Sequence, residues 1–176
     1  QRMARRHAII RRLPAVETLG SVTVICSDKT GTITENQMTV RKVWAGGRMY
    51  DATGDGYDPE GTLAEAGKGS SDLSSASLQR LLTIGAVANN ARLRQVEGRW
   101  LVEGNPSEGG LFVVARKAGL DPEKLRDEIP RVAELPFSSD RKYMGTLHRA
   151  PDGKGRVLYV KGAPDRLLPF CTHVLM

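Results

Sequence analysis

The chain has 176 residues, a formal net charge of +6 and two cysteines, with 40% hydrophobic and 26% charged residues. This balance is that of an ordinary globular protein of one domain, or one domain with part of a second, and excludes collagen-like or wholly disordered chains. Cys26 and Cys171 form no CxxC pair and the histidines have no metal-ligand spacing, so neither a disulfide scaffold nor a zinc site is predicted. The longest apolar runs have five residues, against roughly 20 for a membrane-spanning helix, so we expect this piece to be soluble.

The first predicted elements are a basic helix and a buried strand. Residues 3–12 (MARRHAIIRR) fit an amphipathic helix that ends before Pro14, because the residue before a proline avoids the helical region. Residues 21–27 (SVTVICS) are β-branched and nearly all apolar, which is typical of a strand buried on both faces in a parallel sheet. The polar loop DKTGT follows, and residues 38–44 predict a second strand before a glycine turn.

Residues 51–75 are rich in acidic residues, glycine and serine. Such a composition buries too little apolar surface to offset the entropy cost of ordering, so we predict a mobile insertion with little part in the core. Residues 61–69 (GTLAEAGKG) come close to a P-loop, but five residues instead of four separate the glycines and no predicted strand precedes them.

The rest of the chain combines helices with antiparallel strands. The clearest helix start has Asn105 as N-cap, Pro106 in the first turn and Glu108 at the third position, which is a capping-box pattern. Four helices are predicted: over residues 77–89, from 106 to a stop at Gly119, from Pro122, and from Pro164. A hairpin is predicted at 96–102, and strands at 131–135, 142–149 and 156–160. The fold class predicted is α+β, an antiparallel sheet flanked by helices and preceded by one strand of another domain.

Asp28 is the first candidate for chemistry. A carboxylate directly after a buried strand lies where open α/β sheets place their ligands, although an aspartate in a loop can also be a plain turn residue. Lys29 can offset phosphate charge, Thr30 and Thr32 supply hydroxyl groups, and Gly31 allows the backbone to approach a phosphate closely. Since aspartate is also a covalent nucleophile toward phosphoryl groups, this loop is a candidate phosphoryl site.

Residues 25–34 (ICSDKTGTIT) resemble the phosphorylation motif of the P-type ATPases. The preceding run RRHAIIRRLPAVETLGSVTVI is similar to the stalk that follows the family's fourth membrane helix, and ENQMTV continues the match. NPSEGGL, PFSSDRK and YVKGAPD resemble, in the same order, the DPTEGAL, PFxSxRK and KGAPE signatures of the family's nucleotide-binding domain. The resemblance covers nearly the whole chain except residues 45–75.

For the first motif, the resemblance implies that Asp28 accepts the γ-phosphoryl group of ATP as an aspartyl phosphate, with Lys29 beside it. The Asp28 carboxylate and the Thr30 backbone carbonyl would help to bind Mg²⁺. The cofactors implied are therefore ATP and Mg²⁺.

For the later motifs, the resemblance implies a nucleotide site. Phe137 would lie against the adenine, Lys142 and Lys161 would line the pocket, and Gly162 would keep its wall thin. Glu108 would approach the adenine, although its place in the capping box explains it equally well. Ser139 stands where many calcium pumps carry an arginine that contacts the nucleotide.

The resemblance also implies a division of the chain. Residues 1–20 would be the stalk end and a linker, 21–37 the first strand and loop of a haloacid-dehalogenase-like phosphorylation domain, and 38–176 a nucleotide-binding domain that lacks its C-terminal part. We expect ATP-driven cation transport across a membrane, with calcium as the first choice of ion and this piece on the cytoplasmic face. Its partners would be ATP and the remaining phosphorylation, actuator and transmembrane domains, and the isolated piece would bind ATP without turnover.

Two other functions stay open on the residues alone. A haloacid-dehalogenase-type phosphatase shares the nucleophilic aspartate, but it usually has a second aspartate where this chain has Thr30. A non-catalytic basic binding module would bind nucleic acid with a steep salt dependence. The basic residues lack interleaved aromatics, however, so no nucleic-acid partner is expected.

Overall fold

The computed structural model describes residues 20–68, 72–150 and 153–175. The chain divides into two compact units, Gln1–Asn36 and Gln37–Met176. The helix predicted over residues 3–12 lies outside the described residues. Within the described ranges, no helix is both long and apolar enough to cross a membrane.

Residues 21–27 of the first unit do not form the predicted buried strand. Val24 and Ile25 are exposed, Ile25 by 89%. A strand needs a neighbour to satisfy its backbone hydrogen bonds, and the described part of this unit contains no other strand. The loop after it is ordered locally, because the backbone N–H groups of Ile33 and Thr34 both donate to the Lys29 carbonyl at 3.0 and 3.1 Å.

The second unit begins with a three-stranded antiparallel sheet. It consists of β1 (Lys42–Ala45), β2 (Arg48–Ala52) and β3 (Leu63–Glu65), in that order. The first strand is thus shorter than predicted. Tyr50 and Leu63 are almost fully buried in the core that this sheet forms with two helices.

The prediction that residues 51–75 take little part in the core is therefore wrong. Ala52 and Leu63 belong to the main apolar cluster, and Tyr57 is 7% exposed. Ala52 and Leu63 lie in strands that direct their side chains inward, so they join the core although the segment as a whole is acidic and rich in glycine. Residues 69–71 lie outside the described structure.

Three helices follow the predicted pattern. They are α2 (Ala76–Val87), α3 (Pro106–Lys117) and α4 (Pro122–Glu128). Asn105 caps α3 by accepting the Ser107 N–H at 2.9 Å, and Asp121 caps α4 through the Lys124 N–H. Ser75 stands at the N-cap position of α2, but its side chain makes no capping hydrogen bond.

A hairpin packs on the start of α3. Strands β4 (Arg92–Val96) and β5 (Arg99–Glu103) meet at Glu97 and Gly98, both with positive φ, as a tight hairpin turn requires. Gly109 of α3 lies so close to Val102 that a Cβ there would overlap the valine side chain. The glycine thus permits the close approach of helix and hairpin.

The last sheet is antiparallel, with β6 (Arg131–Leu135), β7 (Tyr143–Arg149) and β8 (Arg156–Gly162) in chain order. The short helix α5 (Pro164–Leu167) and the 3₁₀ helix η2 (Leu168–Phe170) follow. A second apolar cluster joins β8 to α2 and to the residue that ends α4, and it contains Val87, Ala88, Ile129 and Tyr159.

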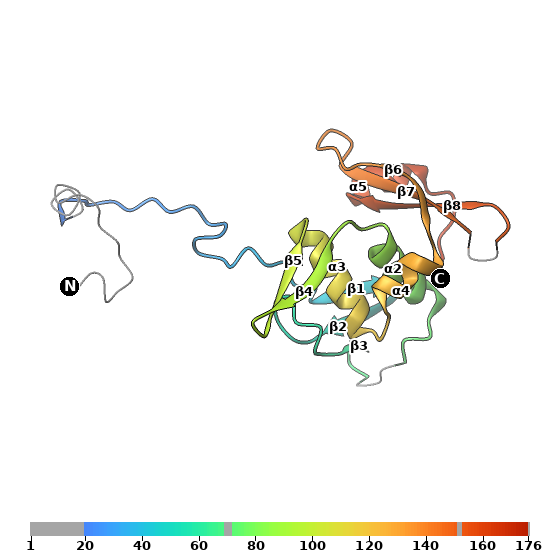
Figure 1. Cartoon of the computed structure of the whole chain (residues 1–176), viewed down its shortest axis with the longest axis horizontal. Coiled ribbons are helices and arrows are strands. Elements are labelled where there is room, and N and C mark those ends of the chain that lie inside the picture. The colour runs from blue at the N-terminus through green and yellow to red at the C-terminus, as the bar shows by residue number, and fades with distance from the viewer. Residues whose placement is uncertain (1–19, 69–71, 151–152, 176) are drawn as a thin grey trace. The chain divides into compact units, whose positions relative to one another are not determined.

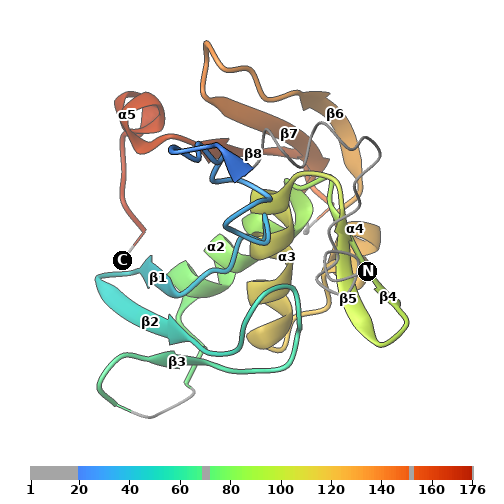
Figure 2. The same ribbon diagram turned by 90° about the vertical axis from the view of Figure 1, so that its left-hand side faces the viewer.

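Helix α2 therefore packs against two sheets, β1–β3 at one end and β6–β8 at the other (Figures 1 and 2). The predicted fold class, α+β with antiparallel strands flanked by helices, is confirmed. The strands are divided among three sheets, where one had been predicted.

Candidate functional site

Glu108 and Lys161 form a largely buried ion pair. Lys161 Nζ donates to Glu108 Oε1 at 2.7 Å, and the Lys161 and Glu108 side chains are only 19% and 13% exposed, respectively. The other carboxylate oxygen of Glu108 accepts the Asn90 backbone N–H at 3.0 Å. Burial lowers the pKa of the Lys161 ammonium, and its hydrogen bond to Glu108 acts in the opposite direction. The Glu108 carboxylate thus joins α3 to β8 and to the segment after α2.

Asn89 holds the backbone around this pair. Its side-chain amide nitrogen donates to the carbonyls of Gly85 and Glu108, both at 2.8 Å, and its side-chain oxygen accepts the Ala91 N–H at 2.8 Å. Only 1% of Asn89 is exposed, so this side chain replaces water for three backbone groups. It connects the end of α2 with the first turn of α3.

Lys142 and Gly162 meet where β7 begins and β8 ends. Lys142 has a φ of 60°, which is uncommon for a residue with a side chain, and its carbonyl accepts the Ala163 N–H at 2.9 Å. A Cβ on Gly162 would overlap the Lys142 carbonyl oxygen and the Tyr143 Cβ. Glycine is therefore required here for the two strands to approach.

Phe137 lies in the loop between β6 and β7, outside the core. It is 60% exposed, and Ser139 and Lys142 in the same loop are exposed as well. Arg141 closes the loop by donating to the Pro136 carbonyl at 2.8 Å. An exposed aromatic face of this kind is available to a flat ligand.

Asp28, Lys29 and Thr30 lie in the exposed loop of the first unit. The other predicted site residues belong to the second unit. The Asp28 carboxylate and the Thr30 carbonyl are oxygen donors, which are the ligands that Mg²⁺ prefers. No cluster of three or more His, Cys, Asp or Glu side chains able to hold a metal ion occurs within residues 20–68, 72–150 and 153–175. Asp28 and Thr30 are the two residues of this loop assigned to such an ion from the sequence.

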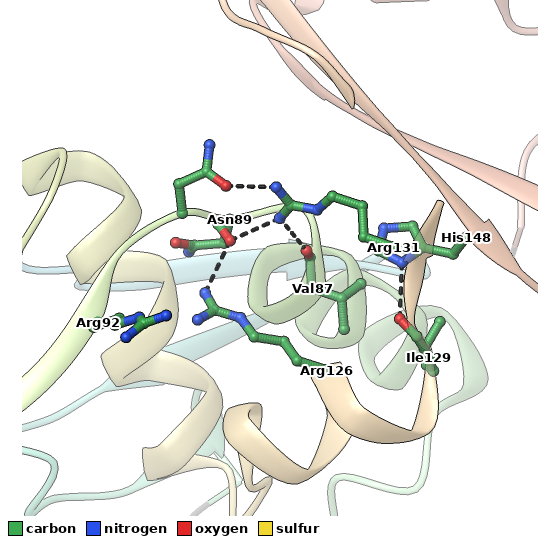
Figure 3. Close-up of a pocket in the computed structure, with 8 residues that line it drawn as sticks. Val87, Asn89, Arg92, Arg126, Ile129, Arg131 and His148 are labelled. Carbon is green, nitrogen blue, oxygen red and sulfur yellow. Dashed lines mark hydrogen bonds between the residues drawn. The ribbon is translucent and has the colours of Figure 1, made fainter. Parts of the chain in front are cut away.

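A cavity of about 230 Å³ lies beside the Asn89 network (Figure 3). Its walls are Val87, Asn89, Asn90, Arg92, Arg126, Ile129, Arg131 and His148. None of these eight residues is predicted from the sequence as a site residue. Their positions depend on contacts between residues about 40 positions apart, such as the bond from Arg126 to the Ala86 carbonyl, and local patterns do not reveal such contacts.

His148 forms one wall of the cavity and is 1% exposed. Its Nδ1 is 2.9 Å from the Ile129 carbonyl oxygen and its Nε2 is 2.8 Å from the Thr146 hydroxyl. A carbonyl only accepts, so Nδ1 carries the proton and Nε2 accepts from Thr146. Burial lowers the pKa of this imidazole, which favours its neutral form.

Comparison with known proteins identifies the family. Residues 77–176 match the family model described as "P-type ATPase, cytoplasmic domain N". Over 171 residues the chain is 51% identical to the "Probable cation-transporting ATPase F" of Mycobacterium tuberculosis, a match that covers 97% of this chain and 19% of the relative. It is 47% identical to "Cation-transporting ATPase pma1" of Synechocystis, over 99% of this chain and 20% of that protein.

A third relative is the "Calcium-transporting ATPase" of Bacillus subtilis, 42% identical over 99% of this chain and 19% of its own length. The chain thus spans about a fifth of the length of the curated relatives it matches.

Proposed function

Because this chain belongs to the P-type ATPase family, we propose that its second unit binds ATP and that its first unit carries the phosphoryl acceptor Asp28 of an ATP-driven cation pump. In the whole polypeptide, ATP hydrolysis through an aspartyl phosphate on Asp28 drives cation transport across a membrane. The ion we propose is calcium, in line with the name of the Bacillus subtilis relative. The other domains of the same polypeptide are the partners of this piece.

The observation that carries the proposal is the pairing of Glu108 with Lys161 beside β7 and β8. The Lys161 ammonium and the Glu108 carboxylate are largely buried, and Lys161 lies next to Gly162 at the end of β8. Phe137 supplies an exposed ring, and Lys142 an exposed cation, in the loop that leads into the neighbouring strand. An aromatic face with nearby cations suits a purine base that carries phosphates.

In the first unit, we propose that Asp28 attacks the γ-phosphorus of ATP and that ADP leaves, with Lys29 offsetting phosphate charge. Asp28 and Thr30 would hold Mg²⁺, which neutralises phosphate charge when bound. Mg²⁺ demands near-octahedral coordination, and we assign it only two ligands in this chain, Asp28 and Thr30. We therefore expect the isolated chain to bind ATP without forming phospho-Asp28, and labelling with γ-labelled ATP tests this.

We further propose the domain division of the sequence analysis, with residues 1–20 as stalk end and linker, 21–37 as part of the phosphorylation domain and 38–176 as nucleotide-binding domain. The division of the structure after Asn36 supports the second boundary. On this division, the nucleotide binds to one domain and the acceptor Asp28 belongs to another.

Calorimetry with ATP and ADP tests the nucleotide site. Stacking of a base on an aromatic ring is worth about 1–3 kcal/mol, so Phe137→Ala should weaken ATP and ADP binding equally, by about 5- to 150-fold. Asp28→Asn should leave both affinities unchanged. Phe170→Ala is the matched control, because Phe170 is 70% exposed and lies outside the proposed site. Normal binding by Phe137→Ala, or ATP bound a hundredfold tighter than ADP, would contradict the proposal.

A further inference from the structure

The cavity beside Asn89 is strongly cationic. Three of its eight wall residues are arginines and none is acidic. The acidic side chains nearby are already engaged, since Glu134 pairs with Arg131 at 2.8 Å and Glu108 pairs with Lys161. His148 adds no charge in its neutral form. Arg92 and Arg126 therefore leave an excess of positive charge on the cavity.

Arg126 is held rigidly. Its Nε donates to the Ala86 carbonyl at 3.2 Å, and its Nη2 donates to the carbonyls of Asn89 and Ala91 at 2.9 and 3.0 Å. Its guanidinium carbon also lies 4.9 Å from the centre of the buried Phe112 ring. These contacts occupy one side of the guanidinium and leave Nη1 with no hydrogen-bond partner within the described ranges.

Arg92 faces Arg126 from the first position of β4. Figure 3 shows the two guanidinium groups turned toward one another, and both line the cavity. The Arg92 side chain is exposed and has no hydrogen bond or ion pair with any described residue. Two guanidinium groups that face each other repel unless an anion lies between them.

The size of the cavity limits the ligand. About 230 Å³ is below the range of roughly 300–1,000 Å³ that is typical of pockets for larger organic ligands. It is enough for a small ion with some water, since one water takes up about 30 Å³ in the liquid. A planar guanidinium group such as that of Arg92 can bind a tetrahedral oxyanion through a pair of parallel hydrogen bonds, and Arg126 can add a donor from Nη1.

We propose that this cavity is a binding site for a small oxyanion of the phosphate class, held between the guanidinium groups of Arg92 and Arg126. The Asn90 side chain forms part of the same wall. The site does not depend on the proposed ATP function, because it uses neither Phe137 nor Lys142 nor Lys161. Free phosphate and the phosphates of a nucleotide share this chemistry, so the experiment has to separate them.

The test is an NMR titration of the 176-residue chain with inorganic phosphate at low ionic strength, following the backbone amide, arginine Nε–Hε and asparagine side-chain signals. We expect saturable shifts at Arg92, Arg126 and Asn90. Arg92→Gln should weaken phosphate binding by about tenfold, the loss of one charge-assisted contact. Arg92 is the residue to change because Arg126 also binds three backbone carbonyls that the fold needs.

Arg99→Gln is the matched control, since Arg99 is an exposed arginine on the same hairpin that does not line the cavity. Equal phosphate affinity in the two variants, or no saturable shift at Arg92 and Arg126, overturns the proposal. Phosphate shifts at Lys142 and Lys161 in place of the arginines also overturn it, because the ion then occupies the proposed nucleotide site. In Phe137→Ala, phosphate should still bind at Arg92 even if ATP binding is lost.

Discussion

Lys161 on β8 and Glu108 on α3 are joined by a 2.7 Å ion pair that is less than one-fifth exposed on either side. Changing one partner leaves the other buried without its counter-charge. We expect Lys161→Met and Glu108→Gln each to lower the free energy of unfolding by about 1–3 kcal/mol. The double variant should lose less than the sum of the two, because the residues share one interaction.

Urea denaturation measures these losses. Lys124→Gln is the control, since Lys124 pairs with Glu128 at 3.7 Å on an exposed face, where an ion pair contributes little. Strict additivity of the Lys161 and Glu108 losses would show that the pair does not act as a unit.

Asn89→Ala should be among the most destabilising single changes in the second unit. It removes the partners of three buried backbone groups, on Gly85, Glu108 and Ala91, and an unsatisfied buried group costs about 1–3 kcal/mol. Thermal melting should give a much smaller loss for Asn90→Ala, whose side chain lies at the surface. Similar losses for the two variants would contradict the role given to Asn89.

Gly162→Ala should disturb the junction of β7 and β8, because the new methyl group overlaps backbone atoms of Lys142. Gly145→Ala is the matched control on the same sheet, since a Cβ there lies at an ordinary 3.5 Å from Leu158. We expect a clear fall in melting temperature for the first variant and little change for the second. Equal effects would mean that the approach at Gly162 relaxes without cost.

His148 should make the stability of the second unit depend on pH. Its pKa is lowered in the folded chain, so the unfolded chain binds a proton first as the pH falls. The stabilisation is therefore complete above about pH 6.5, the ordinary histidine value, and decreases as the pH falls below it. His148→Gln should reduce this slope in urea titrations between about pH 7 and 5, whereas His173→Gln, at an exposed position, should preserve it.

Local signals predicted the second half of the chain well. Asn105 and Pro106 mark the start of α3, and the limits of β6 agree with the prediction, because caps, prolines and alternation act over a few residues. The buried role of Leu63 was missed because a composition average hides single inward-facing side chains. The strand at residues 21–27 was predicted from apolar content alone, without neighbouring strands to pair with.

Prediction of the site residues was limited in the same way, because sequence patterns report on residues that are close together in the chain. Motif resemblance picked out Glu108 and Lys161, which the structure brings together across 53 positions. It gave no indication of Asn89, Arg126 or Arg131, since a side chain that binds distant carbonyls has no local pattern. Asp28 belongs to the other unit, and its part in phosphoryl transfer stays a prediction.

The C-terminal end of α2 is completed by residues made much later. Arg126 donates to the Ala86 carbonyl, 40 positions earlier, and Arg131 donates to the Val87 carbonyl, 44 positions earlier. During synthesis, the apolar cluster of β1–β3, α2 and α3 can close as soon as residue 120 is available, whereas the end of α2 must wait for both arginines. A nascent chain paused between these points would hold a formed first core and a frayed helix end.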